Sequence, residues 1–174
     1  MMNENGVRIF PMGGETADMG DVIRTVSVDA VMTARFRRDE VVDNANIKAG
    51  NVIVGLASYG QANYESQYNG GMGSNGLTSA RHDVFSNSYA EKYPEAYDPN
   101  TDKGFIYSGS KLLTDKVEDS PLDAGKLVLS PTRTYAPVVK KVIDEIRVRN
   151  INGIIHCSGG AQTKVLHYIE NLHV

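Results

Sequence analysis

Cysteine, tryptophan and long apolar runs are what this sequence has least of. Its 174 residues include one cysteine, no tryptophan and four phenylalanines. A single cysteine, Cys157, cannot form a disulfide within the chain, which fits a reducing compartment. No apolar run approaches the roughly 20 residues that a membrane-crossing helix needs. The expected location is therefore the cytoplasm, without a membrane partner.

An excess of positive charge is missing as well. Lysine and arginine together number 18 against 21 acidic residues, which gives a net charge of −3 at pH 7. A basic surface of the kind that binds nucleic acid is therefore not expected. The chain is 41% hydrophobic, which is enough for one buried core, or for one core and part of another.

Glycine, by contrast, is concentrated in an informative place. A short apolar run with strand character ends at Ser58-Tyr59-Gly60, a glycine-rich stretch follows, and Gly73-Ser74-Asn75-Gly76 opens a segment of helical pattern. Such a strand, loop and helix start can cradle an anion, because glycine lets the backbone approach it and unpaired N–H groups point toward it. The segment has neither the lysine of a P-loop nor the GxGxxG pattern. From these residues alone a plain turn is an equal alternative.

Three further motifs accompany this loop. GGETADM (13–19) lies upstream of it, and LSPTRTY (129–135) and HCSGG (156–160) lie downstream. In this order and at this spacing the motifs resemble those of the aminoimidazole ribonucleotide synthetase family, the phosphoribosylformylglycinamidine cyclo-ligases of purine biosynthesis. The resemblance covers nearly the whole chain, and four ordered motifs make it far more specific than any one of them.

The resemblance implies a fold and a domain organisation. The expected class is α/β (α+β), a mixed sheet with packed helices like the family's C-terminal domain. Members carry ATP and magnesium motifs in an N-terminal domain and continue beyond HCSGG, and neither feature is recognisable here. We therefore expect a fragment. Residues 1–40 would be the tail end of the N-terminal ATP-binding domain, and residues 41–174 a C-terminal-type α/β domain truncated at its end.

Hydrophobic periodicity predicts three strands. Residues 25–36 alternate apolar and polar side chains and predict one long half-buried strand, residues 52–57 a second strand, and residues 153–157 a short buried one. In a fragment, the apolar face of residues 25–36 lacks its covering domain, which predicts self-association. The resemblance likewise implies a homo-oligomer, a homodimer in the complete enzyme.

The clearest helix is expected directly after LSPTRTY. Apolar residues from Tyr135 to Ile146 fall on one stripe, with charged residues outside it. Pro137 has no N–H and fits only the first turn. Thr134 is therefore the predicted N-cap.

The other helices are less regular. One is predicted over residues 77–93, where Pro94 ends it. Residues 94–124 are expected to be loop with one helical turn at residues 111–117. A final helix is expected after Gly160.

The resemblance also implies an activity. The family uses ATP to phosphorylate the amide oxygen of formylglycinamidine ribonucleotide, so that a ring nitrogen can close the imidazole. ATP and Mg²⁺ are the cofactors implied, and a small ribonucleotide is the substrate. Gly76 is expected to need a positive φ in the phosphate-binding turn. The residues expected to bind the substrate phosphate are Ser58, Gly60, Gly73, Ser74, Asn75, Gly76 and Thr78.

The first motif is expected to serve the cofactor. Gly13, Gly14, Glu15 and Thr16 are the predicted cofactor-binding residues, with Glu15 as the magnesium ligand, directly or through water. Capping of a helix by Glu15 and Thr16 is the alternative.

His156 is the candidate catalytic residue. Its ordinary pKa near 6.5 suits a proton acceptor or a group that orients the substrate, and a hydrogen-bonded core histidine is the alternative of similar weight. Ala161 stands where the family commonly has a third glycine. Arg133 is expected to form a structural ion pair rather than to bind phosphate.

Residues 61–72 depart from the family pattern. Many relatives have a shorter loop here with a histidine before Ser-Asn-Gly, and no histidine precedes Ser74. The extra residues are either a lid or a plain surface insertion. Two alternatives to the cyclo-ligase remain: a related selenophosphate synthetase, thiamine monophosphate kinase or hydrogenase maturation protein, or a non-catalytic phosphate-binding fragment.

Overall fold

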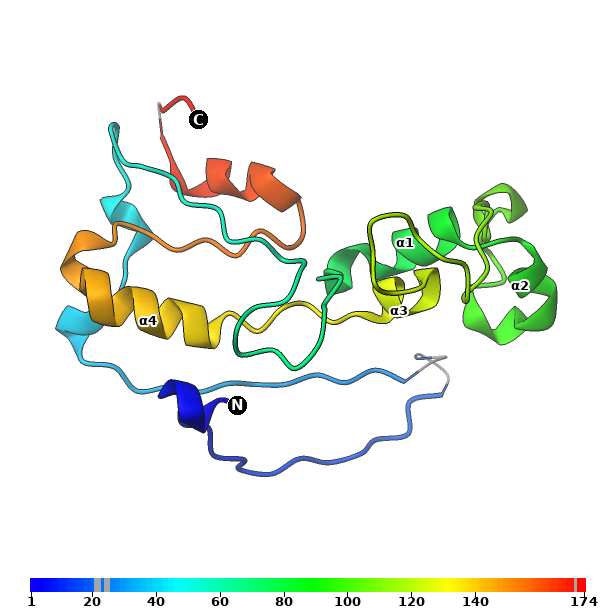
Figure 1. Cartoon of the computed structure of the whole chain (residues 1–174), viewed down its shortest axis with the longest axis horizontal. Coiled ribbons are helices and arrows are strands. Elements are labelled where there is room, and N and C mark those ends of the chain that lie inside the picture. The colour runs from blue at the N-terminus through cyan, green and yellow to red at the C-terminus, as the bar shows by residue number, and fades with distance from the viewer. Residues whose placement is uncertain (21–22, 24–25, 171) are drawn as a thin grey trace. The chain divides into compact units, whose positions relative to one another are not determined.

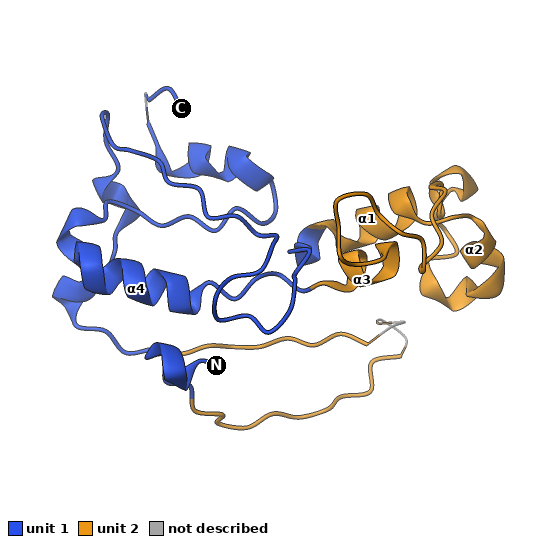
Figure 2. Ribbon diagram, viewed as in Figure 1, with its two compact units in different colours: residues 1–9, 34–75, 131–174 blue, residues 10–33, 76–130 orange. Residues whose placement is uncertain are grey.

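The computed structural model describes residues 1–20, 23, 26–170 and 172–174. These residues form short helices joined by long irregular segments (Figure 1). The chain divides into two units, each built from separated stretches (Figure 2). Unit 1 contains residues 1–9, 34–75 and 131–174, and unit 2 contains residues 10–33 and 76–130. The α-helices are α1 (Leu77–Val84), α2 (Ser88–Lys92), α3 (Ala124–Leu129) and α4 (Ala136–Ile146).

Unit 2 has a small apolar core. Helices α1 and α3 contact each other, and the Asp123 carboxylate caps α3 by accepting a hydrogen bond from the Lys126 N–H at 2.8 Å. Edge-to-face aromatic contacts, such as that between Tyr89 and Tyr107, surround the core. Its buried apolar residues are Phe85, Ile106, Tyr107, Ala124 and Val128.

The prediction of one continuous helix over residues 77–93 is wrong, because the structure has two helices there, α1 and α2. Helix α1 ends at Val84, and Phe85 takes an extended backbone with φ −89° and ψ 151°. Phe85 and Ser86 form single bridges to Lys111 and Gly109, which take this stretch out of the helix. The helical turn expected at residues 111–117 is absent. This stretch has isolated bridges at Lys111 and Lys116 and one hydrogen-bonded turn from Leu112 to Asp115. Helix α3, which begins at the last residue of the stretch expected to be loop, was missed.

Helix α4 of unit 1 follows the predicted stripe, with Pro137 in its first turn as expected. Its N-cap is Tyr135, so the prediction of Thr134 is wrong by one residue. The Thr134 carbonyl accepts a hydrogen bond from the Tyr64 hydroxyl at 2.9 Å. After Gly160 the expected helix is a 3₁₀-helix, Ala161–Tyr168.

The predicted mixed sheet is not formed among the described residues. These residues contain four isolated β-bridges, and none of them belongs to a strand of several residues. The helical part remains compatible with an α/β-type domain. A strand is stabilised by a neighbouring strand, and the three predicted segments have none there. Val54 in the 52–57 segment is 77% exposed. Ile154, in the 153–157 segment that was predicted to be buried, is 45% exposed.

The long 25–36 segment is also unpaired where it is described. Residue 25 lies outside the described residues, and Val26 and Val31 are 92% and 94% exposed. The expected self-association through this segment stays a prediction. No helix in the described part of the chain is long and apolar enough to span a membrane.

Candidate functional site

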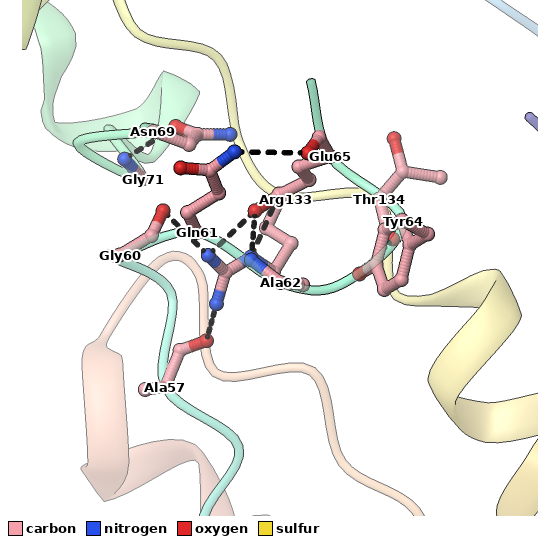
Figure 3. Close-up of polar contacts among 10 residues, drawn as sticks. All are labelled: Ala57, Gly60, Gln61, Ala62, Tyr64, Glu65, Asn69, Gly71, Arg133 and Thr134. Atoms are coloured by element: carbon pink, nitrogen blue, oxygen red, sulfur yellow. Dashed lines mark hydrogen bonds and ion pairs between the residues drawn. The ribbon is translucent and has the colours of Figure 1, made fainter. Parts of the chain in front are cut away.

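Arg133 is the centre of the polar network in unit 1. Its side chain is almost fully enclosed, with 8% of its surface exposed. Its Nε and Nη2 donate to the two carboxylate oxygens of Glu65, both at 2.9 Å. Its Nη1 donates to the Ala57 carbonyl at 2.7 Å and Nη2 to the Gly60 carbonyl at 2.9 Å (Figure 3). The prediction that Arg133 forms an ion pair is confirmed.

Glu65 completes this pair from within the 61–72 stretch. Its carboxylate also accepts a hydrogen bond from the Ala62 N–H at 2.6 Å, and its carbonyl accepts one from the Gln61 side chain at 3.1 Å. Hydrogen bonding to Arg133 holds the pKa of the Glu65 carboxyl below its usual value, and the same contact raises the pKa of Arg133. Both side chains therefore stay charged over the ordinary pH range.

The 61–72 stretch is a closed loop. Gly60 and Asn69 exchange two backbone hydrogen bonds of 2.9 Å across its base. The Asn69 side chain accepts a third from the Gly71 N–H at 2.7 Å. Gly71 has φ +66°, and a Cβ there would overlap the backbone of Ser58. Glycine is therefore required at this close approach.

The loop is fastened to the segment that leads into α4. The Tyr64 hydroxyl donates to the Thr134 carbonyl at 2.9 Å, and the Thr132 hydroxyl donates to the Met72 carbonyl at 3.0 Å. Burial is the main cause that raises the pKa of the Tyr64 hydroxyl, so it remains a donor. The insertion is thus folded against the LSPTRTY motif in this structure.

The HCSGG motif lies beside the LSPTRTY motif and beside Asn75 within unit 1. The rings of Tyr135 and His156 are 6.3 Å apart and nearly perpendicular. A Cβ on Gly159 would lie 3.1 Å from the Asn75 side-chain amide. His156 is exposed, because the 153–157 segment is not a buried strand. The alternative of a core histidine is therefore wrong, while its catalytic role stays a prediction.

The predicted phosphate-binding residues divide between the units. Ser58, Gly60 and Gly73 in unit 1 are half-buried, and the exposed residues Ser74 and Asn75 open a 3₁₀ turn. Gly76 and Thr78 belong to unit 2 and are exposed.

The expected positive φ at Gly76 is wrong. Its φ is −95°, in the right-handed region, and a Cβ there would meet nothing within 4 Å. The backbone enters α1 directly at this residue, so a left-handed turn is not needed.

The first motif belongs to unit 2. Gly13, Gly14, Glu15 and Thr16 are exposed in an irregular segment. No helix starts there, so the alternative of helix capping is wrong. Among the described residues no three His, Cys, Asp or Glu side chains gather as a metal site. The roles of these residues toward ATP and Mg²⁺ stay predictions.

Sequence reasoning missed Glu65, Tyr64 and Thr132. One signal could have found Glu65: it is the only acidic residue between Asp43 and Asp83. A lone carboxylate in a long glycine-rich stretch requires a cation if it is enclosed. The partner lies 68 residues away, and no local pattern indicates it.

Comparison with known proteins gives the same family as the four motifs. No protein-family model matches the chain. It is 31% identical over 170 residues to the phosphoribosylformylglycinamidine cyclo-ligase of Methanocaldococcus jannaschii, a match that covers 92% of this chain and 38% of that protein. The enzymes of the same name from Carboxydothermus hydrogenoformans and Methanosarcina barkeri are 30% and 25% identical and cover 86% and 91% of this chain.

Its relatives are phosphoribosylformylglycinamidine cyclo-ligases. The resemblance seen in the four motifs is thereby confirmed. The shared name favours this family over the selenophosphate synthetase, thiamine monophosphate kinase and hydrogenase maturation alternatives. The chain spans little more than a third of the length of these cyclo-ligases, between 34% and 38%.

Proposed function

We propose that this chain forms the substrate-phosphate side of a cyclo-ligase that closes formylglycinamidine ribonucleotide to aminoimidazole ribonucleotide with ATP. The observation that carries the proposal is the convergence in unit 1 of three motifs that are far apart in sequence. Arg133 joins the 57–72 segment to LSPTRTY, and Gly159 places HCSGG beside Asn75. Residues scattered over about a hundred positions are thus brought together within unit 1.

The groups of this surface suit a phosphorylated ligand. Gly73, Ser74 and Asn75 offer backbone N–H groups together with a hydroxyl and an amide, and hydrogen bonds to a charged phosphate are stronger than those between neutral groups. His156 is exposed on the neighbouring motif and could hold or accept a proton of the substrate. The imidazole lies edge-on to the Tyr135 ring.

ATP and Mg²⁺ enter only through the resemblance to the family. When bound, they would turn the amide oxygen into a good leaving group. The described residues near Glu15 do not assemble a metal site, so no step is assigned to them. The proposal for this chain is limited to binding the ribonucleotide and presenting it to His156.

The test is a titration of the purified chain with formylglycinamidine ribonucleotide and, separately, with the dephosphorylated riboside. We expect the ribonucleotide to bind more tightly. Ser74→Ala should weaken ribonucleotide binding by up to about 1.5–3 kcal/mol, the value of a hydrogen bond to a charged group. His156→Ala should leave the affinity nearly unchanged.

Ser88→Ala, in α2, is the matched control and should have no effect. Equal affinities for the ribonucleotide and the riboside would refute the proposal. A loss for His156→Ala as large as that for Ser74→Ala would place the phosphate elsewhere.

A further inference from the structure

Predicted phosphate-binding residues of unit 1 lie on both sides of the 61–72 insertion. Ser58 and Gly60 precede the insertion, and Gly73, Ser74 and Asn75 follow it. A flexible chain of a dozen residues would leave the separation of the two flanks undefined, because each residue has several backbone states. The structure therefore requires something that fixes both ends of the insertion.

Consecutive residues of one short segment do this. Arg133 donates to the carbonyls of Ala57 and Gly60 at the first end, and Thr132 donates to the carbonyl of Met72 at the second. The two ends are thus held by neighbouring residues. Their separation is set by these contacts with the LSPTRTY motif, together with the backbone hydrogen bonds between Gly60 and Asn69 within the loop.

Glu65 supplies the counter-charge from within the insertion. With Glu65 and the two carbonyls, Arg133 makes four hydrogen bonds, of the five that a guanidinium can donate. Its side chain is 8% exposed and that of Glu65 is 12% exposed. The charge of Arg133 is neutralised inside the loop, so this arginine is not available to a ligand phosphate.

We propose that Arg133 and Glu65 are positioning residues of the candidate phosphate site. They act through the backbone of residues 57–72 and do not touch the ligand. The insertion carries its own anchor, and the anchor restores the geometry that the extra residues would otherwise loosen. This inference rests on the proposed function, because it names the residues that shape the same site.

The experiment compares the wild-type chain with Arg133→Gln, Arg133→Lys and Glu65→Gln. The ratio of ribonucleotide to riboside affinity is measured by titration at fixed salt, and the amide exchange of residues 57–72 by mass spectrometry. Arg133→Gln should reduce the ratio by about tenfold or more and speed exchange in the loop. Arg133→Lys keeps the positive charge but lacks the planar group that bonds both carboxylate oxygens. Its affinity ratio should lie between those of Arg133→Gln and the wild-type chain.

Glu65→Gln keeps the shape of the side chain but removes its charge. It should reduce the ratio less than Arg133→Gln, because the bonds to Ala57 and Gly60 remain. Lys141→Gln is the matched control: its exposed pair with Glu145 in α4 is also broken, and the ratio should not change. A purely structural loss would lower both affinities alike and leave the ratio unchanged.

The outcomes separate this inference from the proposed function. If the wild-type chain prefers the ribonucleotide and Arg133→Gln retains the full preference, the positioning role is overturned while the function stands. If the wild-type chain has no preference, both are overturned. Should Arg133→Gln fail to fold, as judged by circular dichroism, an unchanged ratio in both Glu65→Gln and Arg133→Lys would overturn the positioning role.

Discussion

The buried apolar side chains of Phe85, Ile106 and Tyr107 belong to unit 2, whereas the enclosed side chain among the motifs of unit 1 is that of Arg133. Apolar burial is non-directional and tolerates small shifts of its members. A buried guanidinium is stabilising only when its hydrogen bonds have good geometry. Packing therefore stabilises unit 2, whereas directional hydrogen bonds hold the 61–72 loop of unit 1 in its conformation.

The strongest test of this contrast is Phe85→Ala. Phe85 is 5% exposed at the centre of the unit 2 core, and truncating a buried phenylalanine costs about 3–5 kcal/mol. We expect unit 2 to unfold at lower denaturant concentration, as measured by amide exchange of residues 76–130. The exchange of residues 57–72 should be unchanged.

Phe105→Ala is the control in the same unit, because Phe105 is 72% exposed. It should have little effect. Equal destabilisation of both units by Phe85→Ala would show that they are not independently stabilised.

Gly71→Ala tests the directional side of the contrast. A methyl group at Gly71 would overlap the backbone of Ser58, and the residue has φ +66°. Backbone strain at such a position costs about 1–3 kcal/mol, and the loop must shift. The expected result is faster amide exchange in residues 57–72 and weaker ribonucleotide binding.

Gly55→Ala is the control for Gly71→Ala, since a Cβ at Gly55 would meet nothing within 4 Å. It should leave the loop as it is. An unchanged loop in Gly71→Ala would contradict the close approach of Gly71 to Ser58.

A smaller effect is expected from pH on unit 2. The Tyr107 N–H donates to His82 Nδ1 at 3.2 Å, and only a neutral imidazole can accept this bond. Burial, and next the charge of Arg81, lower the pKa of His82, while Asp83 opposes them.

The folded state therefore binds fewer protons than the unfolded state, whose histidine pKa is near 6.5. The stability of unit 2 should be complete above about pH 6.5 and should fall as the pH drops through the lower folded pKa. Denaturant titrations between pH 7.5 and 5 measure this. His82→Gln should reduce the dependence, and a dependence that is unchanged in His82→Gln would assign it to another group.

The smallest effect is expected from Lys140→Ala. Lys140 pairs with Asp144 one turn later on the exposed face of α4, and exposed pairs of this kind contribute at most about 0.5 kcal/mol. The free energy of unfolding should change by no more than that. A larger loss would show that surface charge, besides the Arg133 network, stabilises unit 1.

Patterns carried by one short stretch of sequence were predicted well. The apolar stripe of α4 and the place of Pro137 follow from the residues of the helix itself. The motif resemblance could also be seen from order and spacing. Each of these depends on neighbours a few positions away.

Features that depend on a distant partner were not predictable in this way. The 52–57 segment has strand character, but an extended segment becomes a strand only beside another one. Arg133 was assigned to an ion pair, yet its partner Glu65 is 68 residues away. The N-cap of α4 is Tyr135 rather than Thr134. The Thr134 carbonyl accepts a hydrogen bond from Tyr64, 70 residues away.

Unit 1 is assembled from three stretches, and one of its contacts spans 110 residues. The Asn44 side chain accepts a hydrogen bond from the Ile154 N–H at 2.9 Å and donates one to the Ile154 carbonyl at 3.3 Å. Closing so long a loop is slow and entropically unfavourable. During synthesis, residues 76–130 are complete before residue 154 is added. We therefore expect α1 to α3 to fold first, the 61–72 loop to be anchored once residues 132–134 follow, and the Asn44 contact of unit 1 to form last.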